Sequence, residues 1–260
     1  MADTQNINSL SNCTANDLAN ARLLVTLASG ETINTSIDAL SAKILPTDDK
    51  NAIFDGVFIM YHRKSDNIPL MVKPWEWTAQ QNAGEIADGV VVCEGGHILV
   101  VAPTGTPSTG LLWSSAAVSG GATTTTDRVT AMNDWNGKAN TASIISKSTT
   151  TAVTNTADYA PGFCNKYERK NANGQGLTAG KWWLPSVGEM MMIYANRTKI
   201  NHCLSLITGA QLLTRDWYWT STEHSSTNVW FLHLTGGLLT NWGTKASSRH
   251  RVRPVSTFIP

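Results

Sequence analysis

The sequence has little charge, and this narrows the classes of function. Of its 260 residues, 15% are charged and the formal net charge is +1, whereas an ordinary globular domain has roughly 25% charged residues. Nucleic-acid binding through phosphates and a polybasic membrane anchor both need a basic surface, so neither is predicted. A polar, weakly charged composition rich in Thr, Ser, Asn and Gly is typical of β-rich extracellular or virion proteins.

Cysteine pairs and long apolar runs are also missing. Cys13, Cys93, Cys164 and Cys203 form no Cys-x-x-Cys pair, which predicts free thiols in place of a disulfide framework. No apolar run reaches the roughly 18 residues that cross a bilayer, so we expect no membrane insertion. Residues 1–20 lack the hydrophobic segment of a signal peptide. A protein made in the cytoplasm that acts outside the cell without such a signal fits a virion component.

Motifs that carry enzyme chemistry are absent as well. The sequence contains no Gly-x-Ser-x-Gly, Gly-x-Gly-x-x-Gly or phosphate-binding loop, and its six histidines have no metal-ligand spacing. We therefore predict no catalytic residues, no metal and no cofactor. An enzyme is the least favoured alternative. Glycoside hydrolysis needs two carboxylates at a fixed separation, and acidic residues are sparse. Asp127 and Asp134, near Trp135, are candidates whose separation the sequence does not define.

A polar, charged stretch at 46–50 divides the chain into two segments, 1–50 and 51–260. The first segment is predicted to hold two short strands and a helix, at 22–27, 32–35 and 37–44.

The second segment is predicted to be α+β, because hairpins come first, helices follow, and a β-meander ends the chain. Strands are expected at 53–61, 89–102 (a hairpin around Glu94-Gly95-Gly96), 217–222, 228–234, 238–244 and 251–258. A long surface loop is expected at 103–130, and helices at 158–170, 187–197 and 200–207. The helix at 187–197 has the clearest signal, because Ser186 and Glu189 have the spacing of a capping box.

The last third of the chain is rich in tryptophan. Trp217, Trp219 and Trp230 are expected in the core because they alternate inward along predicted strands. Trp242 lies among small polar residues, and is predicted to be an exposed anchor for a ligand.

The basic stretch 249–253 has two interpretations. It is a nucleic-acid contact, or it is a solvated or salt-bridged face on which Arg251 and Arg253 lie together with Val252 pointing inward. The near-neutral charge of the whole chain favours the second.

Several motifs of the second segment occur in an order known from one family. They are KWWLPSVGE (181–189), YWTSTE (218–223), Val229-Trp230 and VRPV (252–255). Over roughly 57–260 the chain resembles C-type-lectin-like domains related to formylglycine-generating enzymes. Its ending, RVRPVSTF, is more narrowly similar to the variable proteins of diversity-generating retroelements, which in gut phages are tail receptor-binding proteins. Residues 22–40 resemble attachment segments of phage tail fibres.

The resemblance implies a C-type-lectin-like fold that binds a bacterial cell-surface receptor, protein or glycan, in a virion tail together with other phage tail proteins. The first segment would then serve attachment and oligomerisation, and a homo-oligomer, most simply a trimer, is expected. The family's enzymatic branch depends on active-site cysteines, and because no cysteine follows Cys203 that activity is not implied. The alternative is a bacterial lectin-like module that binds glycan or mediates adhesion without being diversified.

The resemblance also implies where a ligand binds. Variation in the family is concentrated on solvent-facing residues of the last strands and loops, here a display region of about 217–258, whereas inward residues hold the fold. The inward set is Trp219, Trp230, Leu232, Leu234 and Val252. The predicted ligand-binding positions are the display residues His224, Ser225, Ser226, Asn228, Phe231, His233, Thr235, Leu238, Thr240, Asn241, Trp242, Gly243, Thr244, Ser247, Ser248, Arg249 and His250.

Overall fold

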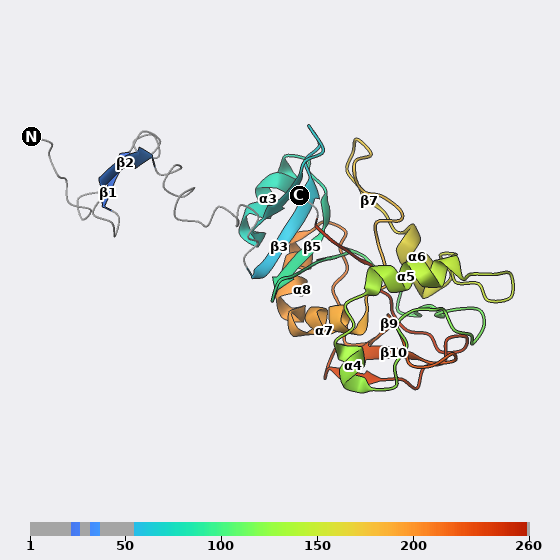
Figure 1. Cartoon of the computed structure of the whole chain (residues 1–260). Helices are drawn as coiled ribbons and strands as arrows, with labels where there is room; N and C mark the ends of the chain where they lie inside the picture. Colours follow the sequence, from blue (N-terminus) through green and yellow to red (C-terminus); the bar gives the residue numbers. More distant parts are fainter. Residues whose placement is uncertain (1–21, 27–31, 37–54, 259–260) are drawn as a thin grey trace, which may run out of the picture. The chain divides into compact units, whose positions relative to one another are not determined.

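The computed structural model describes residues 22–26, 32–36 and 55–258, and its chain divides into two units, 1–53 and 54–260 (Figure 1). In the first unit, β1 (Arg22–Thr26) and β2 (Thr32–Ser36) form an antiparallel pair. This pair confirms the two predicted strands. The predicted helix at 37–44 and Cys13 lie outside the described residues.

The second unit has mixed α and β structure, as the sequence predicts, and its larger sheet has five antiparallel strands in the order β12-β6-β5-β3-β4. These are β3 (Gly56–His62), β4 (Pro69–Val72), β5 (Ala87–Glu94), β6 (His97–Val101) and β12 (Val255–Ser256). The β5–β6 hairpin confirms the predicted turn: Gly95 and Gly96 have φ angles of +56° and +81°, a region open to glycine at little cost.

Helices pack against this sheet and connect it to the rest of the unit. α3 (Pro74–Asn82) contacts β3, and α8 (Arg197–Leu206) contacts both β3 and β5. α7 (Val187–Ala195) contacts β5 as well as the strands of the smaller sheet, so it lies between the two sheets (Figure 1). The predicted capping box of Ser186 and Glu189 is present at its start.

The smaller sheet has three antiparallel strands in the order β11-β10-β9. They are β9 (Trp217–Glu223), β10 (Val229–His233) and β11 (Leu238–Thr240). The strands predicted at 238–244 and 251–258 are shorter in the structure. Beyond Thr240 the chain leaves the sheet, and five residues later the side chain of Lys245 is 0% exposed.

Five further elements complete the second unit. They are α4 (Arg128–Met132), α5 (Gly137–Ser146), α6 (Ala160–Lys166), β7 (Arg169–Lys170) and β8 (Gly176–Leu177). α5 contacts β9 of the smaller sheet, and β7 contacts β5 of the larger sheet. α5 has no apolar periodicity in the sequence, because its buried face includes Gly137, Asn140 and Thr141 beside Ile144. Among the described helices, none is long and apolar enough to cross a membrane.

Two separate apolar cores result from this arrangement. The first core lies among the five-stranded sheet, α7, α8 and one face of the smaller sheet, and includes Trp230 and Leu232. The second core lies on the other face of the smaller sheet and includes Trp113, Trp219 and Phe231. β10 therefore contributes alternate residues to two cores, and both of its faces are covered.

The cysteines of the described residues are free thiols, as predicted. Cys93, Cys164 and Cys203 are free and buried. Burial raises the pKa of Cys93 and of Cys203 to about 11, so these thiols are protonated and unreactive at neutral pH.

Candidate ligand-binding surface

The predicted ligand-binding positions lie on β10, β11 and the loops around them, but their exposure differs widely. Those that are exposed are Ser226, Thr235, Leu238, Trp242, Ser247 and Arg249. Those that are half-buried are His224, Ser225, Asn228, His233, Asn241, Thr244, Ser248 and His250. The remaining three, Phe231, Thr240 and Gly243, are buried. The five residues predicted to hold the fold, Trp219, Trp230, Leu232, Leu234 and Val252, are all buried.

The predicted exposure of Phe231, Thr240 and Gly243 is therefore wrong. The alternation along β10 does separate two faces, but the expected open face is covered by loops. The stretch predicted as a surface loop, 103–130, contributes Trp113, which is 0% exposed and donates from Nε1 to the carbonyl of Thr220 at 3.1 Å. A loop that buries a tryptophan against a sheet closes that face to solvent.

An aromatic cluster occupies the covered face. We define it as Trp217, Trp219, Phe231, His233 and His250. The ring of Phe231 stacks on His250 with centroids 4.3 Å apart, and it meets the two tryptophans edge-on at 5.0 and 5.5 Å. Such contacts add to the free energy gained from burial alone.

The rim of this cluster is open to solvent. His233 lies opposite both Trp217 and Leu238 in the strand register, so the three side chains form a row across the sheet. Trp217 and His233 are half-buried, with ring centroids 4.6 Å apart, and Leu238 is 50% exposed. Trp217 was expected in the core, but it lies at the end of β9, where the covering loops stop.

Gly243 lets the loop approach the cluster closely. A Cβ atom at this position would lie 2.8 Å from Trp219, 2.9 Å from Phe231 and 3.1 Å from Nε2 of His250. These separations are shorter than an ordinary van der Waals contact between carbon atoms. The residue is therefore required for packing and is not free to present a side chain.

His250 is neutral at physiological pH. Burial lowers its pKa to about 4, with a small opposing contribution from the carboxylate of Asp216. Its Nε2 is buried and has no hydrogen-bond partner among the described residues. The imidazole therefore behaves as one more ring of the cluster, in which a charge is unfavourable.

Lys245 fixes the loop that carries Trp242. Its ammonium group donates to the carboxylate of Glu223 and to the carbonyls of Val118, Ser225 and Ser226. Both charged side chains are 0% exposed. Desolvation lowers the pKa of Lys245, and the hydrogen bond to Glu223 opposes that shift.

Glu223 extends this connection to a further loop. Its carboxylate accepts hydrogen bonds from the backbone N–H groups of Gly120 and Ala122, both at 2.9 Å. One buried ion pair thus holds three surface loops, 118–122, 225–227 and 241–250, in a fixed arrangement.

Neither the family models nor the curated proteins include a match to this chain. Residues 55–258 also bring together no group of three or more His, Cys, Asp or Glu side chains that could hold a metal ion. The chemistry of the surface itself therefore carries the functional interpretation.

The surface combines apolar anchors with a polar rim. Trp242 is 80% exposed, the largest exposed fraction among the large apolar side chains described. The loop 241–250 that carries it also presents polar side chains that are exposed or half-buried: Asn241, Ser247, Ser248 and Arg249. An exposed tryptophan within polar surroundings is a common anchor in binding interfaces.

Sequence reasoning missed two residues that organise this surface and misplaced a third. Lys245 and Glu223 are polar side chains whose pairing no local pattern reveals. Arg253 was expected on a solvated face beside Arg251, yet it is 2% exposed. The strand alternation on which that expectation rested does not apply, because the chain forms no regular strand between Arg251 and Pro254.

Proposed function

We propose that this protein is a binding protein whose C-terminal surface, formed by Trp242, Leu238, Trp217 and the loop 241–250, contacts a receptor on a bacterial cell. The observation that carries this proposal is a tryptophan that is 80% exposed on a loop held by a buried ion pair. The exposed indole does not stabilise the fold, because apolar surface contributes favourable free energy only when a partner removes it from water.

The fixed backbone makes this surface suited to binding. Ordering a flexible loop on association costs free energy, whereas a loop already held by Lys245 and Glu223 avoids most of that cost. Tryptophan has only two rotatable side-chain bonds, so its large contact area is ordered at low entropic cost. Both protein and glycan receptors fit these features, since an indole packs against apolar side chains and against the C–H faces of sugars.

The finer assignment rests on sequence motifs. We propose a C-type-lectin-like fold and a phage tail receptor-binding protein of the kind diversified by retroelements. The motif at 181–189 leads into α7 and that at 218–223 is most of β9, so both sit where they support the binding surface. The alternative is a bacterial lectin-like adhesion module that is not diversified. Sequencing of the genomic region tests the choice: a neighbouring reverse-transcriptase gene with a near-copy of the 3′ coding repeat would favour the first.

Oligomerisation is part of the proposal because a single small patch is expected to bind its receptor weakly. Interfaces that bury less than roughly 1,200 Å² are typically transient. Three copies on one tail tip would raise the avidity by about 10² to 10⁴. We therefore propose a homotrimer in a virion tail.

A whole-cell binding assay with the full chain tests the proposal. Fluorescently labelled protein is titrated onto a panel of bacterial strains, and bound protein is measured by flow cytometry. Because loss of an anchoring tryptophan costs about 2 kcal/mol or more, Trp242→Ala is expected to weaken binding to a recognised strain at least about 30-fold.

The chain supplies a matched control. Trp75 on α3 is 76% exposed, almost as much as Trp242, but it lies outside the proposed surface. Trp75→Ala is expected to bind like the unaltered chain. The proposal is wrong if Trp75→Ala abolishes binding while Trp242→Ala retains it, or if the unaltered protein binds none of the strains.

A further inference from the structure

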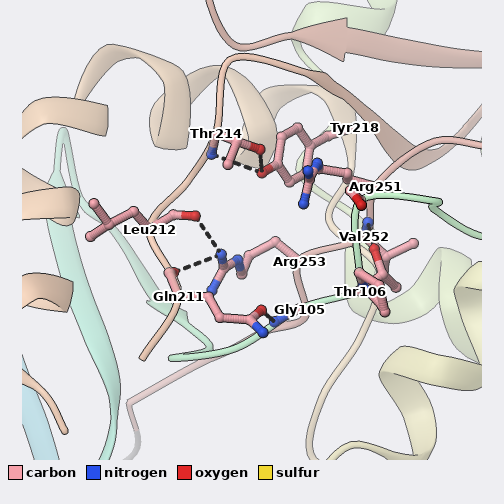
Figure 2. A pocket seen from close by; sticks show the side chains of 11 residues that line it. Gly105, Thr106, Gln211, Leu212, Thr214, Tyr218, Arg251, Val252 and Arg253 are labelled. Atoms are coloured by element: carbon pink, nitrogen blue, oxygen red, sulfur yellow. Dashed lines mark hydrogen bonds between the residues drawn. The ribbon is translucent and has the colours of Figure 1, made fainter. Parts of the chain in front are cut away.

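A pocket of about 290 Å³ lies beside β9, and none of the residues proposed for the receptor surface lines it. It is formed by three segments, 105–108, 211–214 and 251–253, together with Tyr218 (Figure 2). Its volume is near the lower end of the roughly 300–1,000 Å³ typical of small-molecule sites. The pocket therefore has room for a small ligand or for one group of a larger one.

A buried arginine forms part of the wall. Arg253 is 2% exposed. Its terminal amino groups donate to the carbonyls of Ala102 and Pro103 at 3.0 and 2.9 Å, and to those of Gln211 and Leu212 at 2.9 and 3.3 Å (Figure 2). A guanidinium group has five N–H donors, so only the Nε–H remains. That atom is buried and has no partner among the described residues.

The positive charge of Arg253 has no counter-ion in the described part of the chain. No carboxylate there lies within ion-pair distance of its guanidinium, and its four hydrogen bonds go to neutral carbonyls. A buried charge is costly unless it is paired. A bound anion would supply the missing pair.

Two other residues that line the pocket, Arg251 and Gln211, have free donors. Arg251 uses Nε to bind Asp216 at 2.7 Å, which leaves its terminal amino groups available. The Gln211 side chain accepts a hydrogen bond from Gly105 N through its oxygen at 3.1 Å, so its NH₂ group is free to donate. No Asp or Glu lines the pocket.

Gly105 lies close to Arg253 at one side of the pocket. A Cβ atom at this position would lie 2.4 Å from the carbonyl oxygen of Val252 and 3.3 Å from Nε of Arg253, so the backbone packs closely here and encloses the Nε–H group. The mouth is formed in part by Leu212, which is 49% exposed. A small ligand can therefore enter the pocket from solvent and lie near the guanidinium charge of Arg253.

We propose that this pocket binds the oxyanion group of a small acidic ligand, a carboxylate or a phosphate, through the terminal amino groups of Arg251 and beside the unpaired guanidinium charge of Arg253. Arginine is the side chain best matched to both groups, because its planar donors complement pairs of oxygen atoms. The proposal does not depend on receptor binding by the surface around Trp242.

The test is a calorimetric titration of the full chain at constant ionic strength with three probes: inorganic phosphate, glycerol 3-phosphate and glucuronate. Saturable binding of at least one probe is expected. Tighter binding of glycerol 3-phosphate identifies a phosphate ester as the source of the oxyanion, and tighter binding of glucuronate identifies an acidic sugar. Binding of none of the three overturns the proposal.

Variants locate the site. Arg253→Gln deprives four carbonyls of their donors and threatens the fold, so substitutions at the mouth are preferable. Leu212→Glu adds a negative charge that repels the anion, and Arg251→Gln removes a donor. Each variant is expected to weaken binding at least tenfold. Leu212→Gln, which matches Leu212→Glu in size but is neutral, is expected to change binding much less.

The control is Arg215→Gln. Arg215 is exposed and does not line the pocket, and its replacement removes the same charge from the same region. The affinity of the Arg215→Gln variant for the oxyanion probe is expected to stay within twofold of that of the unaltered chain. Equal weakening by Arg215→Gln and Arg251→Gln would show diffuse charge attraction and overturn the proposal. Trp242→Ala is expected to retain oxyanion binding, which separates this site from the receptor surface.

Discussion

The five-stranded and three-stranded sheets bury their strands in different ways. In the larger sheet, β5 presents the run Val90, Val91 and Val92, each 0% exposed, and apolar side chains surround it. In the smaller sheet, β9 ends in Thr220, Ser221, Thr222 and Glu223, also 0% exposed. The first is stabilised mainly by apolar packing, and the second needs hydrogen bonds to loops in order to be buried at all.

This difference explains how polar loops can carry a binding surface. Loops 118–122 and 241–250 have too few apolar residues to pack by themselves, and the Lys245–Glu223 pair holds them from beneath. The side chains that point outward, such as Trp242 and Ser247, take no part in that connection. They can therefore be replaced at little cost to the fold, whereas replacements beneath the loop are costly.

The largest expected effect is loss of the buried ion pair. Lys245→Met leaves the Glu223 carboxylate buried and unpaired, which costs about 3 to 5 kcal/mol. We expect the free energy of unfolding, measured by urea denaturation, to fall by that amount.

Two further variants sharpen this result. The double variant Lys245→Met with Glu223→Leu removes both charges and is expected to recover part of the loss. In the region of the larger sheet, the ion pair of Arg63 with Asp66 is exposed at 42% and 37% of the two side chains, so Arg63→Ala should change stability by less than about 0.5 kcal/mol. If Lys245→Met and Arg63→Ala lowered the free energy of unfolding equally, the buried ion pair would contribute no more than the exposed one, and the contrast between the two regions would be wrong.

The next largest effect is expected at Phe231. The side chain is 5% exposed and packs among Trp217, Trp219 and His250. Phe231→Ala is expected to lower the free energy of unfolding by about 3 kcal/mol, because it leaves a cavity among the rings. Chemical denaturation monitored by tryptophan fluorescence measures the change. A loss below about 0.5 kcal/mol would show that Phe231 is a display position after all.

A pH effect of similar or smaller size is expected from Glu189 in α7. Burial raises its pKa from 4.5 to about 7, so the folded chain holds a proton that the unfolded chain releases between these values. Stability from this group is therefore present below about pH 4.5 and is lost as the pH rises toward 7. The loss amounts to about 3 kcal/mol.

Glu189→Gln isolates this contribution. Unfolding curves at pH 5 and pH 8 are compared for the two chains, and the variant should lack the decline. His250 contributes in the opposite direction in both chains: its pKa of about 4 lies below that of an unfolded histidine, so stability is lost as the pH falls through this range. A decline of the same size in the Gln variant would show that another group is responsible.

The smallest effect is expected at the surface itself. Trp242→Ala is predicted to change the free energy of unfolding by less than about 0.5 kcal/mol, since the side chain is 80% exposed. Differential scanning calorimetry gives this value. A loss comparable to that of Phe231→Ala would mean that the loop depends on its tryptophan, and the separation of display from fold would fail.

Local signals in the sequence predicted local structure well. The capping box of Ser186 and Glu189 located α7, and the two glycines at 95 and 96 located the β5–β6 turn. Alternation along β10 assigned Trp230 and Leu232 to the interior. In each case, the information lies within a few neighbouring residues.

Features that depend on distant segments could not be predicted in this way. Alternation along β10 places Phe231 and Trp230 on opposite faces of the sheet. It cannot reveal that Trp113, more than a hundred residues earlier, covers the face on which Phe231 lies. The same holds for Lys245, whose partners come from several loops. For the candidate site, the exposed anchor at Trp242 was predicted because its neighbours are small and polar.

The contact of Gly243 with three rings has a practical consequence for engineering. A combinatorial library built on this loop should keep codon 243 constant and randomise the codons on either side of it, because any β-carbon there would displace Trp219, Phe231 or His250. Library members that vary this position would be eliminated for misfolding before selection for a new target begins.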